Sequence, residues 1–387
     1  MSFCDNDDEQ SENGDSKKFK SPETLRSDIN QLQKSLYGID LDLFASIFTE
    51  KFNIFEFYEK VGDLSMLALT EAALDYYGLI KPKGKSYLDY NCFSNFISKV
   101  RLNYLNNPYH NQLHAMDVLQ TTLVMITKLN FEESFSDLDL SAILISALLH
   151  DIGHPGLNNS YQINKQTKLS LRYNDKSVLE NHHCSLGFKI LNEENSNLLS
   201  NLSKEEYKLF RKRCIEMILS TDMTQHSNVI SAVQYKIDVL NSKSTQVLPL
   251  IKGDDEQGTV SDIDETSLLE QLLDCKDKSK RFQNEQGIMN FIIHLADISN
   301  PTKSVKIYEK WANRVTEEFF AQGDLEKKEG LEISFLCNRE TVNIQRGQIG
   351  FISSIVIPSF KILSSFSKKV KYLEENAEEN KRALIWL

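Results

Sequence analysis

Apolar residues recur at three- and four-residue steps through most of the chain, which is the spacing of amphipathic helices. In the N-terminal part this pattern predicts helices at Ser27–Leu36, Leu41–Phe48, Gly62–Tyr77 and Tyr90–Asn103. Residues 1–20 are instead polar, acidic and rich in Ser and Asn. They have little to bury and predict a disordered lead-in.

The same spacing predicts helices through the rest of the chain. The expected segments are a helix that starts at Asn106-Asn107-Pro108 and carries His110 and His114 on one face, Ser141–Leu149, Ser177–Leu191, Ser203–Asp222, Gly287–Ala296, Ser304–Gln322, Glu329–Phe335 and Arg346–Ser367. Leu157–Ser170 and Ser227–Gln283 lack the pattern and are expected to be irregular, with a surface insertion at about 240–282. Because no alternating run predicts strands, residues 21–387 are expected to form one all-α domain.

The composition is that of a soluble globular protein, with 41% hydrophobic and 26% charged residues among 387. The formal net charge of −11 argues against a nucleic-acid-binding surface, which needs a basic face. No apolar run approaches the roughly 18 residues of a membrane span and no signal peptide opens the chain, although it could belong to a membrane-attached parent. Six cysteines without a CxxC pair indicate reduced thiols and a cytoplasmic location. The sequence makes no prediction of oligomeric state.

Candidate chemistry centres on His150 and Asp151, which follow the apolar run ending at Leu149. These two side chains at the end of a buried helix cost desolvation unless a cation takes up the charge, and both are metal-ligand types. His114 upstream and Asp297 downstream supply the rest of a coordination sphere. This order is the signature of HD-type metal hydrolases. It predicts a metal held by these four residues, with positions left open for water as in catalytic sites.

Longer motifs make the sequence resemble one family. In chain order they are YHNQLHAMDV at 109–118, HDIGHPG at 150–156 with Asn159, VLENHH at 178–183, STDM at 220–223, ADISNPTK at 296–303, WANRVTEEFFAQGD at 311–324 and GQIGF at 347–351. Together they resemble the class I 3′,5′-cyclic nucleotide phosphodiesterase catalytic domain over most of Asn107–Phe360. The resemblance implies hydrolysis of cyclic AMP, cyclic GMP or both to 5′-nucleoside monophosphates, in control of cyclic nucleotide signalling.

The resemblance also implies two metal ions and an acid. A zinc ion would be held by His114, His150, Asp151 and Asp297. Asp151 would also bind a second ion, Mg²⁺ or Mn²⁺, whose other ligands are waters held by His154, Glu180 and Thr221. A water or hydroxide bridging the two ions would attack the cyclic phosphate. His110 would protonate the departing ribose O3′, and Glu318 would orient and charge His110.

A nucleotide pocket is implied in the same way. Gln348 would hydrogen-bond the purine edge, while Phe351 and Val315 would cover the two faces of the base. The remaining walls would be Tyr109, Met223, Asn300 and Phe319. A side-chain amide reads adenine or guanine according to its orientation, so both substrates stay open, with a lean toward cyclic AMP.

Two other functions fit parts of this pattern. Another HD-type hydrolase, acting on deoxynucleoside triphosphates or linear phosphodiesters, would keep the metal ligands. It would lack the pairing of His110 with Glu318 and of Gln348 with Phe351. A catalytically inactive scaffold of the same fold would have lost a ligand or the acid, and none is lost here.

Two features lie outside the family pattern or its assignments. Gly153 stands where many members carry an acidic residue, which could alter the surroundings of the metal waters. His182 and His183 are interpreted as core or surface residues without a ligand role.

Overall fold

The structure is a computed structural model that describes residues 40–81, 86–247 and 268–386. All regular secondary structure in these residues is helical, so the predicted all-α fold is confirmed. The predicted lead-in and the predicted helix Ser27–Leu36 lie outside the described residues.

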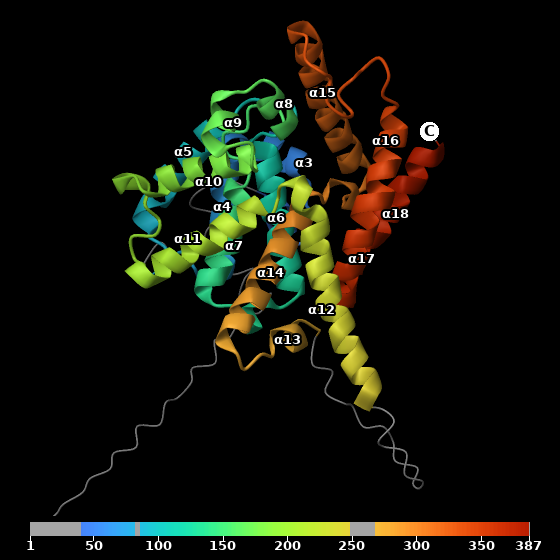
Figure 1. The fold of residues 1–387 in the computed structure, drawn as a ribbon. Helices are drawn as coiled ribbons and strands as arrows, with labels where there is room; N and C mark the ends of the chain where they lie inside the picture. Colours follow the sequence, from blue (N-terminus) through green and yellow to red (C-terminus); the bar gives the residue numbers. More distant parts are fainter. Residues whose placement is uncertain (1–39, 82–85, 248–267, 387) are drawn as a thin grey trace, which may run out of the picture.

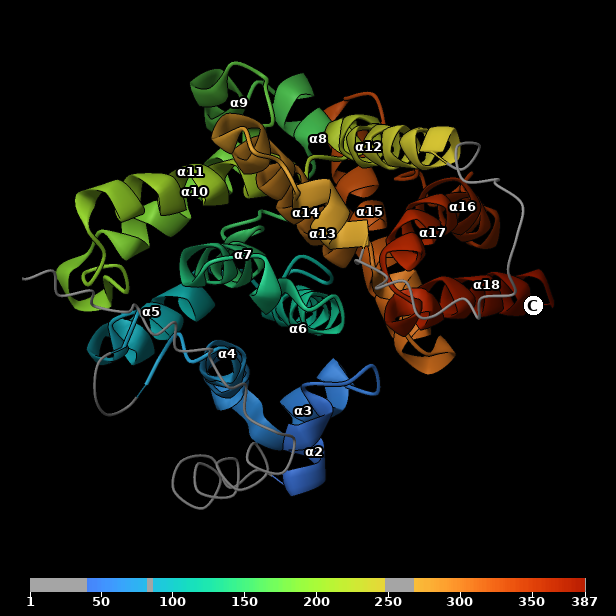
Figure 2. The same ribbon diagram turned by 90° about the horizontal axis from the view of Figure 1, so that it is seen from below.

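The first helices form one side of the molecule (blue to cyan in Figures 1 and 2). They are α2 (Leu41–Ser46), α3 (Ile54–Val61), a 3₁₀ turn (Gly62–Leu64), α4 (Ser65–Tyr76) and α5 (Tyr90–Asn103). Asp40, Asn53 and Asp89 cap α2, α3 and α5, because their side chains accept backbone N–H groups of the first turn. Three of the predicted helices are confirmed here, whereas α3, only 8 residues long, was not predicted.

The core of the molecule is built on α6 (Gln112–Lys128) and α7 (Asp137–Leu149). These helices pack on each other, and α4, α11 and α14 pack against them (Figure 2). Ser136 and Asp139 form a capping box at the start of α7, which is buried along nearly its whole length. A helix buried on every side needs the continuous apolar run that the sequence shows. His150 therefore leaves α7 inside the protein.

The middle of the chain contains α8 (Asn159–Asn164), α9 (Lys168–Tyr173), α10 (Val178–Leu191), α11 (Lys204–Leu219), a 3₁₀ turn (Met223–Gln225), α12 (His226–Val247), α13 (Leu268–Leu273) and α14 (Lys278–Asp297). Ser203 and Glu206 form a capping box at the start of α11. The irregular structure predicted for Leu157–Ser170 is wrong, because α8 and the start of α9 lie there. The irregular structure predicted for Ser227–Gln283 is also wrong, because most of α12, all of α13 and the start of α14 lie there. Residues 248–267 lie outside the described residues.

The C-terminal part consists of α15 (Val305–Glu329), α16 (Ile344–Phe351), a π-helical turn (Ile352–Val356), α17 (Ile357–Phe366) and α18 (Lys371–Trp386). In Figure 1, α15 extends above the core and α16 to α18 lie on one side of it. The predicted helix Glu329–Phe335 is wrong. Gly330 ends α15 in the left-handed conformation, with φ 71°, and residues 331–334 have no regular structure.

One run among the described residues, Ile344–Phe366, is long and apolar enough to cross a membrane by length and composition. The prediction that no such run exists is wrong by that test. A single helix of this kind is weak evidence for a span, since a core helix passes the same test. Part of this run, including Ile352, Val356 and Phe360, is buried inside the protein.

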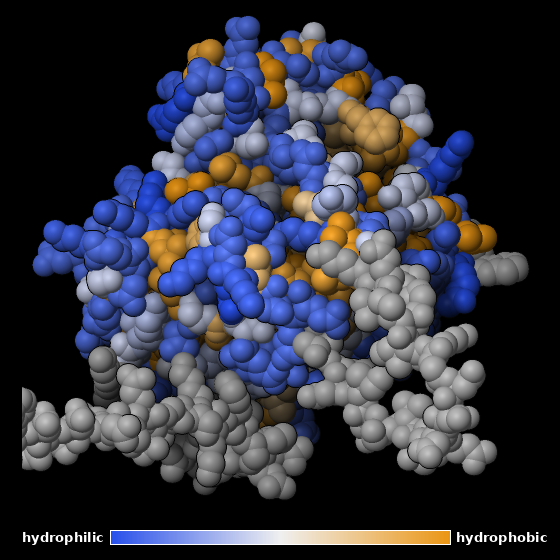
Figure 3. Space-filling view, turned by 60° about the horizontal axis from the view of Figure 1, so that its bottom comes forward, coloured by the Kyte–Doolittle hydropathy of each residue, from blue (hydrophilic) through white to orange (hydrophobic). Residues whose placement is uncertain are grey.

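The molecular surface is mainly hydrophilic on the face shown in Figure 3, with smaller hydrophobic patches between polar side chains. Five cysteines among the described residues are free thiols: Cys92, Cys184, Cys214, Cys275 and Cys337. The cytoplasmic location stays a prediction.

Candidate active site

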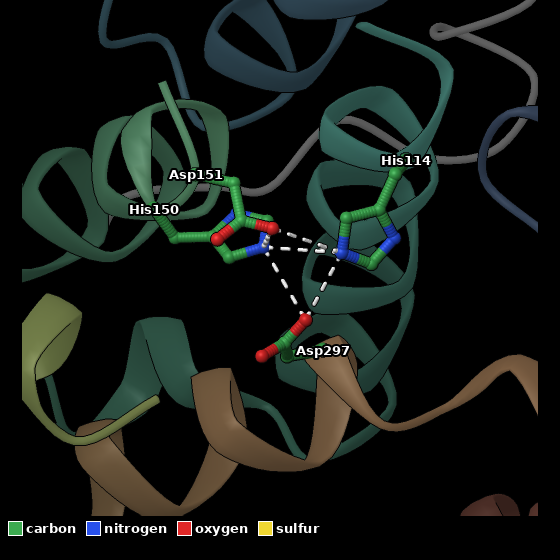
Figure 4. Close-up of side chains that lie close together, drawn as sticks. All are labelled: His114, His150, Asp151 and Asp297. Atoms are coloured by element: carbon green, nitrogen blue, oxygen red, sulfur yellow. Dashed lines mark hydrogen bonds and ion pairs between the residues drawn. The ribbon is translucent and has the colours of Figure 1, made fainter. Parts of the chain in front are cut away.

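The four residues predicted to bind a metal lie together where α6, α7 and α14 meet (Figure 4). His114 lies in the first turn of α6. His150 and Asp151 follow the last residue of α7, and Asp297 ends α14. Packing of the three helices thus brings together residues as far apart in sequence as 183 positions.

The ligand-type atoms of this cluster are spaced as the ligands of one ion would be. Nε2 of His114 lies 3.0 Å from Oδ1 of Asp297 and 3.4 Å from Oδ2 of Asp151. Nε2 of His150 lies 3.2 Å from Oδ2 of Asp151 and 3.3 Å from Oδ1 of Asp297. Atoms that each lie about 2.0–2.2 Å from a common ion have separations of this order. The donor set and its spacing fit a divalent metal ion.

Neighbouring groups orient His150 and keep Asp297 ionised, and both effects favour binding of a cation. Nδ1 of His150 donates to the carbonyl oxygen of Ala147 at 2.9 Å, so the lone pair of the neutral ring is on Nε2, which faces the cluster. Burial acts to raise the pKa of Asp297, but His150 and His114 outweigh it and hold that pKa below its usual value. Two carboxylates buried at one place need positive charge beside them, which a bound divalent cation would supply.

His110 and Glu318, the predicted acid and its partner, also lie together. Nδ1 of His110 donates to Oε1 of Glu318, and the backbone N–H groups of Tyr109 and His110 donate to Oε2 at 2.8 and 3.0 Å. Burial acts to lower the pKa of His110, but Glu318, with smaller contributions from Asp151 and Asp297, outweighs it and raises the pKa to about 9. Nε2 of His110 lies 4.0 Å from Oδ2 of Asp151, so the other edge of the ring faces the metal cluster.

The prediction that one helix carries both His110 and His114 is wrong. Helix α6 begins at Gln112, because the side chain of Asn111 caps it by accepting the N–H of Leu113 at 2.8 Å. His110 lies in the turn before the helix. This difference lets His110 contact α15 while His114 faces the metal cluster.

His154, predicted to hold a metal-bound water, stacks on His110 with ring centroids 3.8 Å apart and planes 15° apart. Nδ1 of His154 accepts the backbone N–H of Gly156 at 3.0 Å, so the neutral ring carries its proton on Nε2. Burial, with the nearby charge of His110, holds the pKa of His154 well below its usual value. His154 is therefore a neutral donor beside a cationic His110.

Glu180 and Thr221 were assigned to the same water-holding group. Burial raises the pKa of Glu180 to about 7, and the charges of Asp222 and Asp151 act in the same direction, so Glu180 lies within electrostatic reach of the cluster. Thr221 is buried and its hydroxyl donates to the carbonyl of Ile218 at 2.8 Å. None of the contacts among the described residues joins Thr221 directly to the cluster.

His183, which was assigned no role, also borders the cluster. Its Nδ1 donates to the carbonyl of Ile152 at 2.7 Å, and its Nε2 lies 3.6 Å from Oδ1 of Asp151. The sequence carried a signal for this position. Residues three apart on a helix share a face, and His183 follows Glu180 by three on α10.

A cavity of about 470 Å³ opens beside the metal cluster. All seven residues predicted to bind substrate line it: Tyr109, Met223, Asn300, Val315, Phe319, Gln348 and Phe351. His110 and Asp297 line it as well, so the cavity opens onto both the predicted acid and the metal cluster. Its size is that of a pocket for a small organic ligand.

Two side-chain amides in the cavity are oriented by neighbours. Oε1 of Gln348 accepts the hydroxyl of Tyr308 at 2.8 Å. Oδ1 of Asn300 accepts the hydroxyl of Tyr109 at 2.5 Å, and its Nδ2 donates to the buried Asp117 at 3.4 Å. The roles of Tyr308 and Asp117 were not predicted, because neither follows from spacing along the chain. These neighbours determine which atoms of each amide remain for a ligand.

Residues 109–377 match the model of the 3′5′-cyclic nucleotide phosphodiesterase family, and the chain belongs to this family, as predicted. It is 35% identical over 288 residues to a probable 3′,5′-cyclic-AMP phosphodiesterase of Caenorhabditis elegans. It is also 35% identical over 267 residues to the 3′,5′-cyclic-AMP phosphodiesterase, isoform F, of Drosophila melanogaster. These matches cover 73% and 69% of this chain but 38% and 36% of the relatives, so the chain spans little more than a third of their length.

The fold is similar to a solved structure of the same class. That structure is the phosphodiesterase domain of the RhoPDE fusion protein from the choanoflagellate Salpingoeca rosetta. The two chains are 28% identical with a TM-score of 0.73, and the match covers 92% of this chain and 97% of the other.

Proposed function

We propose that this chain hydrolyses the 3′,5′-phosphodiester of cyclic AMP to 5′-AMP and so controls cyclic nucleotide signalling. The position of His110 carries this proposal. His110 lines the cavity and holds Nε2 4.0 Å from a carboxylate oxygen of the metal cluster. A cyclic phosphate at this junction would reach the cluster and the acid together, with its base extending toward Gln348.

The proposed ions are zinc, held by the four-residue cluster, and Mg²⁺ or Mn²⁺ beside Asp151. When bound, the pair supplies an activated water and stabilises negative charge on the phosphate. The chain orients the surrounding waters through the Nε2–H of His154, and we assign the same task to Glu180 and Thr221. The tautomer of His154 set by Gly156 supports the first of these assignments.

The leaving group determines what His110 must do. As the water oxygen bonds to phosphorus, the bond from phosphorus to O3′ breaks and O3′ needs a proton. The Nε2–H of His110 is placed to supply it. Glu318 holds Nδ1 and keeps the ring protonated at neutral pH, since the pKa of His110 is raised to about 9.

Cyclic AMP is favoured over cyclic GMP by the relatives and by the oriented amide. Both Drosophila and nematode relatives carry names of cyclic-AMP phosphodiesterases. Because Oε1 of Gln348 accepts from Tyr308, Nε2 remains free to donate to a ring nitrogen of adenine. The second lone pair of Oε1 can accept from the adenine amino group. Phe351 and Val315 would cover the faces of the base.

The test uses purified protein loaded with zinc and either Mg²⁺ or Mn²⁺. Release of 5′-AMP and 5′-GMP from the two cyclic nucleotides is followed with and without a chelator. We expect chelator-sensitive release, with the larger kcat/KM for cyclic AMP. No release of either product from folded, metal-loaded protein would overturn the proposal and favour the triphosphate-hydrolase or scaffold functions.

A further inference from the structure

The side chain of Asn107 lies between the two turns that carry His110 and His154. Its Nδ2 donates to the carbonyl oxygen of His110 at 2.8 Å and to that of His154 at 2.7 Å. An amide nitrogen carries two hydrogens, so one is used on each turn. Asn107 and His154 are 47 residues apart in the chain, which makes this a tertiary contact between the segment before α6 and the segment after α7.

The surroundings of Asn107 leave its amide little freedom. A Cβ added at Gly156 would lie 2.9 Å from Oδ1 of Asn107, so the side chain lies directly against the backbone there. Gly156 also has φ +74°, a conformation that favours glycine. The backbone carbonyl of Asn107 accepts the side chain of Asn111, the cap of α6, at 2.8 Å. Contacts to its side chain and to its backbone carbonyl therefore both hold Asn107 in place.

The other contacts of this segment lead elsewhere. Glu318 holds the backbone and ring of His110, and Arg314 donates to the carbonyl of Pro108 at 3.0 Å, so both tie the segment to α15. Among the hydrogen bonds of the described residues, the one from Asn107 to His154 joins segment 106–111 to the turn at 150–156. That turn begins with the metal cluster's own His150 and Asp151.

We infer that Asn107 is a positioning residue that sets where His110 lies relative to the metal cluster. This inference rests on the proposed function, in which His110 is the acid. Without the amide, two carbonyl oxygens lose their donor and the stacked rings of His110 and His154 lose their common support. Proton transfer to a leaving group depends on sub-ångström placement of the acid. The loss should therefore appear in the chemical step.

The experiment compares Asn107→Ala and Asn107→Asp, alone and combined with His110→Ala. The Asp variant keeps the size of the side chain and removes both donors, so it remains informative if the Ala variant folds poorly. We expect kcat for cyclic AMP to fall about 10- to 100-fold in each single variant, with little change in KM or metal content. In the His110→Ala background the same change should cost less than about twofold, because the residue then has no acid to position.

A substrate analogue gives a readout that a general structural role would not produce. In cyclic AMP with sulfur in place of O3′, the thiolate leaves without needing a proton. Asn107→Asp and His110→Ala should both hydrolyse this analogue at nearly the wild-type rate. Asn103→Ala is the matched control, since Nδ2 of Asn103 donates to the carbonyl of Lys99 at 2.8 Å and reaches neither histidine. It should leave kcat unchanged.

Two results would overturn the inference. One is a fall in kcat for Asn107→Asp that multiplies with the fall caused by His110→Ala in the double variant. The other is a fall in kcat for Asn107→Asp that is as large on the sulfur analogue as on cyclic AMP. Failure of the proposed function looks different. His110→Ala would then keep the wild-type kcat, or the wild-type chain would hydrolyse neither cyclic nucleotide.

Discussion

Glu318 accepts three hydrogen bonds from Tyr109 and His110, although 208 residues separate it from His110 in the chain. One carboxylate oxygen receives both backbone N–H groups and the other receives the ring. The Glu318 side chain therefore fixes the turn before α6 and also favours the protonated form of His110, which lies in that turn. Its neighbour Glu317 is exposed, as one member of an adjacent acidic pair usually is.

Glu318→Gln should keep the shape of this contact while removing its charge. The imidazolium of His110 is the donating form, present below its pKa and lost as pH rises through it. Since Glu318 raises that pKa to about 9, its neutralisation lowers the pKa, and the pH above which kcat/KM falls should move to lower values. We expect kcat near neutral pH to fall about 10- to 100-fold.

The measurement is a pH profile of kcat/KM for cyclic AMP, with Glu317→Gln as the matched control. Glu317 is exposed on the same helix, and its variant should reproduce the wild-type profile. An unchanged basic limb in Glu318→Gln would show that Glu318 does not set the charge of His110.

Helices could be predicted from the sequence where neighbouring residues alone determine them. The apolar run before His150 predicts a buried helix, and α7 is one because every turn faces protein. Helix α12 was missed because much of it faces solvent and carries polar residues, with Val233 and Ile237 as its buried contacts. Helix α6 begins four residues after Pro108, where the start was predicted, because Asn111 caps it. The preference of Asn for helix caps indicates this start from the sequence alone.

The metal cluster was predictable because its residue types are rare and fall in a recognisable order. The orientation of groups around it was not. Tyr308 controls the amide of Gln348 from a helix position that also suits a core aromatic residue. Likewise Asn107 reaches the carbonyl of His154 only after two distant turns fold together. Such contacts depend on tertiary packing, which spacing along the chain does not record.

Metal removal should affect stability as well as turnover. An ion that binds only the folded state stabilises it by about 2.7 kcal/mol when present at 100 times its dissociation constant. A chelator should therefore lower the melting temperature of the wild type by several degrees. Asp151→Ala and Asp297→Ala should abolish turnover and lose metal, and their melting temperatures should no longer respond to the chelator.

The control for metal removal is Asp324→Ala, an exposed aspartate that pairs with Arg339 on the surface. Its metal content and chelator response should match the wild type. Normal activity in Asp297→Ala would rule out the proposed ligand set.

Substrate choice should depend on the orientation of the amide at Gln348. Tyr308→Phe removes the hydroxyl that donates to Oε1 and leaves the amide free to turn. We expect the ratio of kcat/KM for cyclic AMP over cyclic GMP to fall several-fold. Gln348→Ala should also weaken or alter the preference, because no amide then reads the base. Unchanged selectivity in both variants would remove Gln348 from the base-reading site.

Gly323 on α15 should be the least replaceable glycine near the cavity. A Cβ there would overlap the carbonyl oxygen of Cys337, and backbone cannot move aside as a side chain can. Gly323→Ala should therefore displace the loop that carries Phe335 and Leu336, two residues of the cavity wall. We expect a loss of about 1–3 kcal/mol in unfolding free energy and a higher KM for cyclic AMP.

Gly350→Ala provides the contrast, measured by the same denaturant unfolding and kinetics. Gly350 is exposed on α16 with no atom within 4 Å of an added Cβ, so alanine should stabilise the helix by up to about 1 kcal/mol. The two substitutions are chemically identical and differ in sign because only one site lacks room. Equal stability of the two variants would mean that the Cys337 loop does not pack against α15 in solution.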